Sequence, residues 1–179
     1  MHKKNYLILI LFALGLLIAC NSSDHQNFSK TADQVVLKPF SDSLKVDTFK
    51  VSLVGDVLKD ITIQFTITSH GGQLIYKKDF KATDLIENYK SSVDLKKERT
   101  QLAFIKDEYK LFFEDENFLE PAVTENENPD KNTPDINFYN ELKQSALNGF
   151  KYRSGKETSV YIAWSEKEKK VKPYYSCCK

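Results

Sequence analysis

The sequence predicts an α+β fold, mainly β, built as an antiparallel sheet or sandwich of six or seven strands with one or two short helices. Three observations predict it. Apolar and polar residues alternate in several short segments, which is the period of a half-buried strand. Short turns rather than helical crossovers join these segments, which favours antiparallel pairing. Only residues 136–149 show a clear helical period.

The clearest strands lie between residues 47 and 80. In TFKVSLVG, apolar Phe49, Val51 and Leu53 alternate with polar residues, and DITIQFTITS continues the same pattern. Ser69-His70-Gly71-Gly72 then supplies turn residues, and QLIYKKDF returns as the partner strand. This order predicts a β-hairpin.

The segments that follow are less regular. KATDLIENY predicts a short helical turn capped by Thr83. TQLAFIKDEYKLFFED fits either a helix through Leu102, Ile105 and Tyr109 or a second hairpin with strands at 103–105 and 111–113. Its aromatic and β-branched content favours the hairpin.

The C-terminal third predicts a loop, one helix and two strands. Residues 120–135 are rich in Pro, Asn and acidic residues and form the loop. Asp135 then caps INFYNELKQSALNG, which Gly149 closes. SVYIAWS predicts a strand with Val160, Ile162 and Trp164 on one side, and VKPYYSC predicts an edge strand because Pro173 lacks an N–H donor.

The N-terminus predicts a signal peptide. A short basic segment precedes an uncharged, mostly apolar run over residues 6–19, which ends at Cys20. The run is shorter than the roughly 20 residues that a membrane-spanning helix needs. Leu17-Ile18-Ala19-Cys20 resembles the lipobox of bacterial lipoproteins. The resemblance implies cleavage before Cys20, a diacylglycerol on its sulfur and a further acyl chain, such as palmitate, on its amino group.

Three regions follow from this interpretation: a signal peptide over residues 1–19, the lipidated Cys20 with a flexible polar tether over residues 20–46, and a single β-rich domain over residues 47–179. Several acyl chains give a stable membrane anchor. Asn21 follows Cys20 where many inner-membrane lipoproteins have Asp, so the resemblance implies the outer membrane. It leaves open whether the domain faces the periplasm or the medium.

A second resemblance covers about residues 45–178. LIYKKDF, KLFFEDENFLEPAV and FYNELKQ are similar to small lipoproteins of gut anaerobes that are grouped as a domain of unknown function. That family has no assigned activity, so the resemblance implies no catalytic residue.

The charge balance excludes nucleic acid as a partner. Of 26 basic residues, Lys3 and Lys4 leave with the signal peptide, so 24 remain against 25 acidic residues. Only Arg99 and Arg153 are arginines, although arginine is the usual reader of phosphates and base edges. A chain with no basic excess lacks the electrostatic footprint of a nucleic-acid-binding protein.

Histidines and the acidic loop give no metal or catalytic site. Only His25 and His70 remain after cleavage, which excludes a zinc site with several histidines. His70 lies in a turn beside two glycines, a poor position for a catalytic base. The segment starting at Asp130 loosely resembles a calcium loop, but Pro134 stands at a ligand position. We therefore expect no metal and no cofactor.

Adjacent acidic pairs are expected to be surface charges. Asp107 and Glu108, and likewise Asp115 and Glu116, fall in segments predicted as exposed turns. Carboxylate-based glycosidases instead use two carboxyl groups that flank a cleft at a set separation. No residue is therefore assigned as catalytic.

Two residue pairs near the C-terminus are the remaining candidates. Tyr174 and Tyr175 should point to opposite faces of their strand, so at least one would be exposed and could stack on a sugar or a partner. Cys177 and Cys178 are adjacent, which predicts either a strained vicinal disulfide or an idle pair on a tail.

The functional hypothesis is a lipid-anchored cell-envelope protein that acts as a non-enzymatic binding or accessory module. Its partners would be the membrane, through the N-terminal lipid, and an envelope protein or a glycan. The alternative is an envelope hydrolase with a carboxylate-based site that the sequence does not display.

Overall fold

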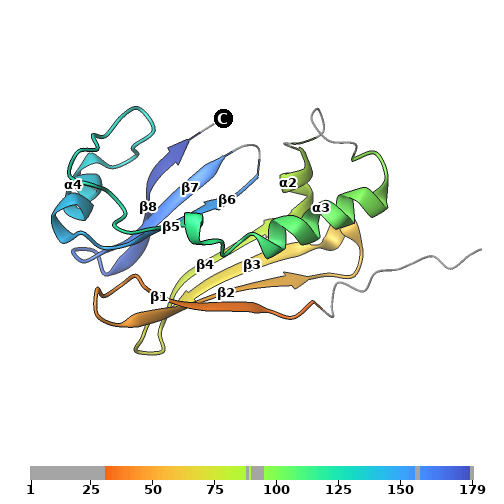
Figure 1. Cartoon of the computed structure of the whole chain (residues 1–179), viewed down its shortest axis with the longest axis horizontal. Helices are drawn as coiled ribbons and strands as arrows, with labels where there is room; N and C mark the ends of the chain where they lie inside the picture. The colour runs from red at the N-terminus through yellow and green to blue at the C-terminus, as the bar shows by residue number, and fades with distance from the viewer. Residues whose placement is uncertain (1–30, 88, 90–94, 156–157, 178–179) are drawn as a thin grey trace, which may run out of the picture.

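The computed structural model describes residues 31–87, 89, 95–155 and 158–177. Within these residues, eight strands form two four-stranded antiparallel sheets, and three α-helices accompany them (Figure 1). The predicted α+β, mainly β class is therefore confirmed. The described residues contain eight strands where six or seven were predicted, and three α-helices where one or two were predicted. None of the helices in the described residues has both the length and the apolar character of a membrane span.

Sheet A has the order β1-β2-β3-β4 and contains the predicted hairpin. Its strands are β1 (Gln34–Pro39), β2 (Val46–Val54), β3 (Thr62–Thr68) and β4 (Leu74–Lys81). Alternate residues of β2 and β3 are buried, as the sequence pattern predicts. The turn between β3 and β4 is closed by a 2.8 Å hydrogen bond from the Gly72 N–H to the Ser69 carbonyl, and Gly72 has a φ of 81°, which glycine tolerates.

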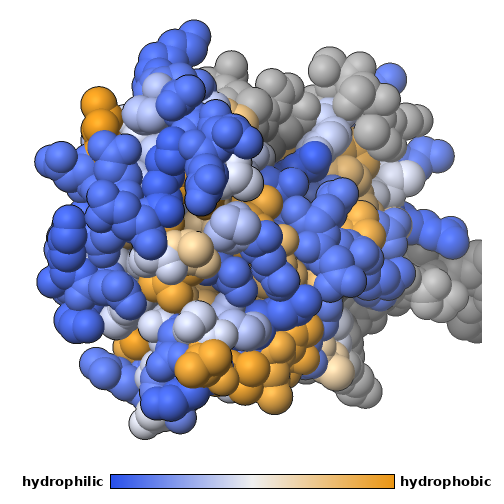
Figure 2. Space-filling view, turned by 60° about the vertical axis from the view of Figure 1, so that its left-hand side comes forward, coloured by the Kyte–Doolittle hydropathy of each residue, from blue (hydrophilic) through white to orange (hydrophobic). Residues whose placement is uncertain are grey.

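The predicted tether was wrong from residue 34 onward, because residues 34–39 form β1 and pair with β2. Apolar residues occupy both sides of this strand. Val35 and Leu37 face outward with 54% and 59% of their surface exposed, whereas alternate residues, including Lys38, are half-buried. Figure 2 shows apolar surface at the lower edge of the view. On the inward side Val36 packs against buried core residues, while Gln34 and Lys38 are polar. Three consecutive apolar residues, 35–37, therefore hide the alternation that identifies a half-buried strand.

The predicted second hairpin was also wrong, because residues 98–110 form the helix α3 (Glu98–Lys110). Ile105 and Tyr109, four residues apart, are its buried positions, and this spacing puts them on one helix face. The buried Tyr109 hydroxyl donates to the Val51 carbonyl at 2.9 Å, which attaches α3 to sheet A. The short helix α2 (Ala82–Glu87) is confirmed, although Thr83 lies inside it rather than at its cap.

Sheet B has the order β5-β6-β7-β8. Its strands are β5 (Phe118–Leu119), β6 (Gly149–Arg153), β7 (Ser159–Ser165) and β8 (Lys170–Cys177). The strands β7 and β8 were predicted, and β8 is an edge strand as Pro173 indicated. The strands β5 and β6 were not predicted. Short 3₁₀ turns, η2 (Leu58–Asp60) and η3 (Asp115–Asn117), precede β3 and β5.

The helix α4 (Ile136–Ser145) begins as predicted but ends earlier. The Asp135 side chain accepts a 3.0 Å hydrogen bond from the Phe138 N–H, which is the expected cap. The same carboxylate lies 2.9 Å from the Lys172 ammonium and so connects α4 to β8. Ala146, with a φ of 52°, ends the helix. Gly149, the predicted terminator, begins β6 instead.

Two hydrophobic cores result. The larger contains the buried residues of β2 and β3, residues of α3, and Phe150, Tyr152 and Ile162 of sheet B. The smaller lies between α4 and the other side of sheet B, where Phe138 and Leu142 pack near Ala163 and Tyr174. Figure 1 shows α3 along sheet A and α4 at the other end of the molecule against sheet B. Sheet B is thus covered on both faces.

Replacing Phe150 by alanine should lower the free energy of unfolding by about 3–5 kcal/mol, the usual cost of removing a buried aromatic ring. The ring is fully buried and lies within 6.4 Å, centroid to centroid, of six other aromatic rings. Urea denaturation measures the change. Leu44→Ala is the control, because Leu44 is 91% exposed and should change stability by no more than about 0.5 kcal/mol. Equal effects of the two variants would contradict the central role of Phe150.

Candidate functional site

An irregularity in β8 brings both candidate tyrosines to one place. Tyr175 pairs with Tyr161 of β7, whereas the next residue of β7, Ile162, pairs with Pro173. Tyr174 is therefore an extra residue, which makes this a β-bulge. The prediction that Tyr174 and Tyr175 point to opposite faces was wrong, because a bulge interrupts the alternation on which it depended. Both tyrosines line the same cavity.

This tyrosine cavity has a volume of about 460 Å³. Its size falls within the range of roughly 300–1,000 Å³ that is usual for ligand pockets. Its walls come from β5 and the loop after it, from α4, and from β7 and β8. The lining residues are Phe118, Leu119, Glu120, Pro121, Ala122, Thr124, Glu127, Asn128, Asp130, Tyr139, Tyr161, Tyr174 and Tyr175.

The tyrosine rings of the cavity stand at steep angles to one another. The Tyr161 and Tyr175 rings are 5.2 Å apart at 88°, and the Tyr161 and Tyr174 rings are 6.1 Å apart at 72°. Tyr139 of α4 lies 6.4 Å from Tyr174 at 56°. Tyr161 and Tyr175 are partly exposed, whereas Tyr139 and Tyr174 are buried. The cavity therefore has two accessible rings supported by two buried ones.

Tyr174 is fixed by hydrogen bonding and by close packing. Only 3% of its surface is exposed, and its hydroxyl donates to the Ala122 carbonyl at 2.8 Å. A Cβ atom at position 149 would lie 2.9 Å from this hydroxyl oxygen and 3.0 Å from the Ala122 Cβ. Position 149 thus requires glycine because Tyr174 and Ala122 leave no room for a Cβ atom. It does not end the helix, contrary to what the sequence suggested.

Tyr175 holds the acidic loop against β8. Its hydroxyl donates to the Asp130 carboxylate at 3.1 Å and accepts from the Asn132 side-chain amide at 3.2 Å. The Asn132 carbonyl accepts from the Ser176 N–H at 3.1 Å. The segment starting at Asp130, which loosely resembles a calcium loop, therefore contributes to the wall of the cavity. In the described part of the chain, no group of three or more potential metal-ligating side chains is present.

The electrostatic character of the tyrosine cavity is negative. Its lining includes the carboxylates of Glu120, Glu127 and Asp130 and no lysine or arginine. Burial raises the pKa of Tyr139, and the charges of Glu127 and Asp130 raise it further. Burial likewise raises the pKa of Tyr174, with Glu127 adding to the effect. An anionic ligand would therefore be repelled.

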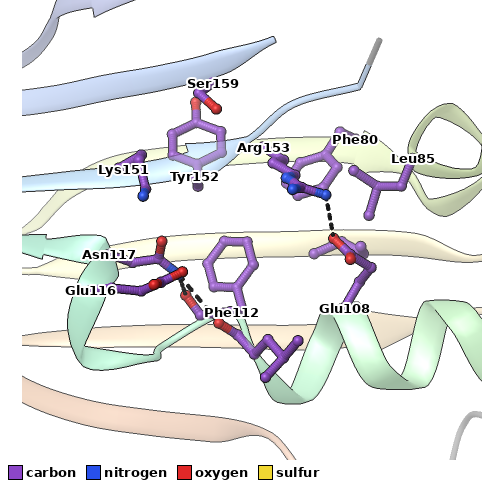
Figure 3. Close-up of a pocket in the computed structure, with 12 residues that line it drawn as sticks. Phe80, Leu85, Glu108, Phe112, Glu116, Asn117, Lys151, Tyr152, Arg153 and Ser159 are labelled. Atoms are coloured by element: carbon purple, nitrogen blue, oxygen red, sulfur yellow. Dashed lines mark hydrogen bonds and ion pairs between the residues drawn. The ribbon is translucent and has the colours of Figure 1, made fainter. Parts of the chain in front are cut away.

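A second cavity, of about 190 Å³, lies between β6, α3 and η3 (Figure 3). Lys151 and Arg153 reach it from β6, and Glu108 reaches it from α3. The Glu108 carboxylate is 3.5 Å from the Arg153 guanidinium, and only 21% of the Glu108 side chain is exposed. Burial raises the pKa of the Glu108 carboxyl in spite of this cation. The cavity is smaller than usual ligand pockets.

The outcome for the acidic pairs is mixed. Glu108 lies in α3 and faces the second cavity, so its assignment to an exposed turn was wrong. Sequence reasoning missed its orientation because the hairpin was favoured over the helix in this segment. Asp115 and Glu116 lie in η3 and are exposed, as expected for surface charges, although Glu116 borders the second cavity.

The remaining predicted residues are partly outside the described chain. Cys20 and Cys178 lie outside the described residues. The structure therefore does not test the predicted lipidation at Cys20 or the predicted pairing of Cys177 with Cys178. Cys177 is half-buried at the end of β8. His70 lies in the predicted turn, where its backbone N–H donates to the buried Asp47 carboxylate at 2.8 Å.

Tyr161 and Glu127 of the tyrosine cavity were among the lining residues not singled out from the sequence. Tyr161 lies between Val160 and Ile162, so the alternation of that strand already places it on the face away from the larger core. Glu127 comes from the irregular loop, where no period indicates which way a side chain points. Comparisons with family models, curated proteins and solved structures found no match to this chain.

The Glu108 carboxyl should titrate above the ordinary glutamate value of 4.5. Arg153→Met should raise that pKa further, since it removes a cation 3.5 Å away. A raised pKa means that the folded state binds the proton more tightly, so this group lowers stability as pH rises through the interval between 4.5 and the folded-state pKa. Carboxyl ¹³C NMR measures the titration, and Glu108→Gln identifies the signal. A pKa at or below 4.5 would contradict the desolvation of Glu108.

Proposed function

We propose that this protein is a lipid-anchored binding module of the cell envelope, attached through Cys20 to the outer membrane, that holds a ligand in the tyrosine cavity without catalysing a reaction. The lipobox-like residues Leu17–Cys20 support the anchor. The cavity supports the binding role, because it has ligand-sized volume, partly exposed rings and a few polar groups at its rim.

The observation that carries the proposal is the bulge at Tyr174. A regular strand would place Tyr174 and Tyr175 on opposite faces, and only one of them could reach the cavity. The extra residue lets Tyr174 form the floor while Tyr175 forms a wall and fixes the loop through Asp130. Bulges are over-represented next to functional sites, where they redirect a side chain.

The two buried carboxylates give no support to the alternative of a hydrolase. Asp47 and Glu141 are the buried acidic residues of the described chain. Asp47 accepts from the Ser41 and His70 N–H groups at 2.6 and 2.8 Å. Glu141 accepts from the Ser165 hydroxyl at 3.0 Å. These carboxylates are engaged within the protein, whereas carboxylate-based hydrolysis needs a pair that faces the substrate.

The anchor predicts acylation at one cysteine. Cells that express the full-length chain and take up a labelled palmitate should place label on the protein and recover it in the membrane fraction. Cys20→Ser should lose the label and membrane retention, because the acceptor sulfur is gone. The double variant Cys177→Ser/Cys178→Ser is the matched control and should keep both. Label that persists in Cys20→Ser would disprove this anchor.

The binding role predicts ligand capture at the tyrosine cavity in cells. A diazirine-bearing amino acid at position 128, on the cavity rim, should form a discrete adduct on irradiation, detected by mass spectrometry of the full-length chain. The same amino acid at position 98, an exposed position on α3, is the control and should not form that adduct. No adduct at 128, or the same adducts at both positions, would refute ligand binding at this cavity.

A further inference from the structure

We infer that the ligand of the tyrosine cavity is an organic cation, a group bearing an alkylated ammonium without an attached phosphate. This inference rests on the proposed binding role and specifies the chemistry of the same cavity. It follows from three features of the described residues: the arrangement of the rings, the carboxylates that have no cationic partner, and the lack of a basic residue in the lining.

The rings form the walls of an aromatic cage. Tyr161 stands nearly perpendicular to Tyr175, at 88°, and at 72° to Tyr174. These rings pack edge to face and line one cavity, and a cation near the face of such a ring is attracted by its quadrupole. Aromatic cages of this kind recognise quaternary and methylated ammonium groups. A flat sugar-stacking platform would instead present one extended ring face.

The carboxylates around the cage differ in how they are neutralised. Glu120 lies 4.0 Å from the Lys38 ammonium, which also lies 4.8 Å from the Phe118 ring centroid. Glu127 and Asp130 form no ion pair with a lysine or arginine in the described part of the chain. The nearby Lys143 donates to the main-chain carbonyl of Glu127 at 2.6 Å rather than forming an ion pair with its carboxylate.

Both carboxylates are held in place by neutral donors. Glu127 accepts from the N–H and the hydroxyl of Thr124 at 2.6 and 2.9 Å, and Asp130 accepts from Tyr175 and from the Asn132 N–H. These contacts fix the two negative charges at the cavity without cancelling them. A cation in the cage would gain attraction from both, whereas a neutral polyol would gain only hydrogen bonds.

The test compares choline with 3,3-dimethylbutan-1-ol, a neutral molecule of the same shape, as ligands of the purified full-length chain in detergent. Protein NMR titration measures both affinities. Choline should bind at least about tenfold more tightly than the alcohol, the effect expected of a cation at partly desolvated rings. Phosphocholine, which represents a phospholipid headgroup, should bind more weakly than choline because its phosphate meets the carboxylates.

Variants assign the effect to the cage. Tyr161→Leu should abolish the preference for choline, and Glu127→Gln with Asp130→Asn should weaken choline binding while leaving the alcohol unaffected. These isosteric changes remove the charges. Glu127→Gln keeps an oxygen that can accept from both Thr124 donors, whereas Asp130→Asn keeps one of the two accepting oxygens. Glu108→Gln, which removes one negative charge at the second cavity, is the matched control and should leave choline binding unchanged.

Each result decides the inference. Selective choline binding that is lost in the cage variants supports it. Equal binding of choline and the alcohol overturns the charge selectivity while leaving the proposed binding role intact. Failure of both to bind also overturns it, and the crosslinking at position 128 then decides the binding role separately. Tighter binding of phosphocholine than of choline contradicts the exclusion of phosphate.

Discussion

The packing of Phe150 is the constraint on which the structure depends. Its ring contacts Phe49 and Phe65 of sheet A and Phe112 beyond α3, so one side chain joins both sheets and the chain that follows the helix. Because residues of a strand alternate between faces, an inward Phe150 directs Gly149 outward. That outward position is where the Tyr174 hydroxyl approaches too closely for any Cβ. The larger core and the tyrosine cavity are therefore set by the same strand.

The tyrosine cavity lies on the face of sheet B that is turned away from the larger core. On that face α4 and the acidic loop cover the sheet only in part, and the cavity lies between them. The helix α4 packs Phe138 and Leu142 against that face, and the Asp135–Lys172 ion pair holds the start of the helix to β8. The acidic loop covers the rest and contributes polar side chains rather than apolar ones. Between helix and loop, tyrosines replace the aliphatic residues of an ordinary core, which leaves a space that is aromatic at its floor and negatively charged at its rim.

The sequence predicted the fold class and the elements whose periods are clear, and its errors have physical causes. The strands β2, β3, β4, β7 and β8 and the capped helix α4 follow from alternation and capping. The helix α3 was the alternative to the favoured hairpin, because its aromatic residues also suit strands and only tertiary packing of Ile105 and Tyr109 decides its state. Sequence reasoning did single out Tyr174 and Tyr175. Their shared cavity could not be predicted, because it depends on a bulge and on a loop without a period.

The bulge makes the candidate site depend on chain length as well as on residue type. One inserted residue changes which face every later side chain of the strand occupies. A related chain could therefore retain each tyrosine of β7 and β8 and still lack the cage, if its last strand were one residue shorter. Conversely, a chain with other aromatic residues but the same extra position would keep two adjacent rings in one cavity. Counting residues between Ile162 and Tyr175 is thus a more direct criterion for this site than comparing their identities.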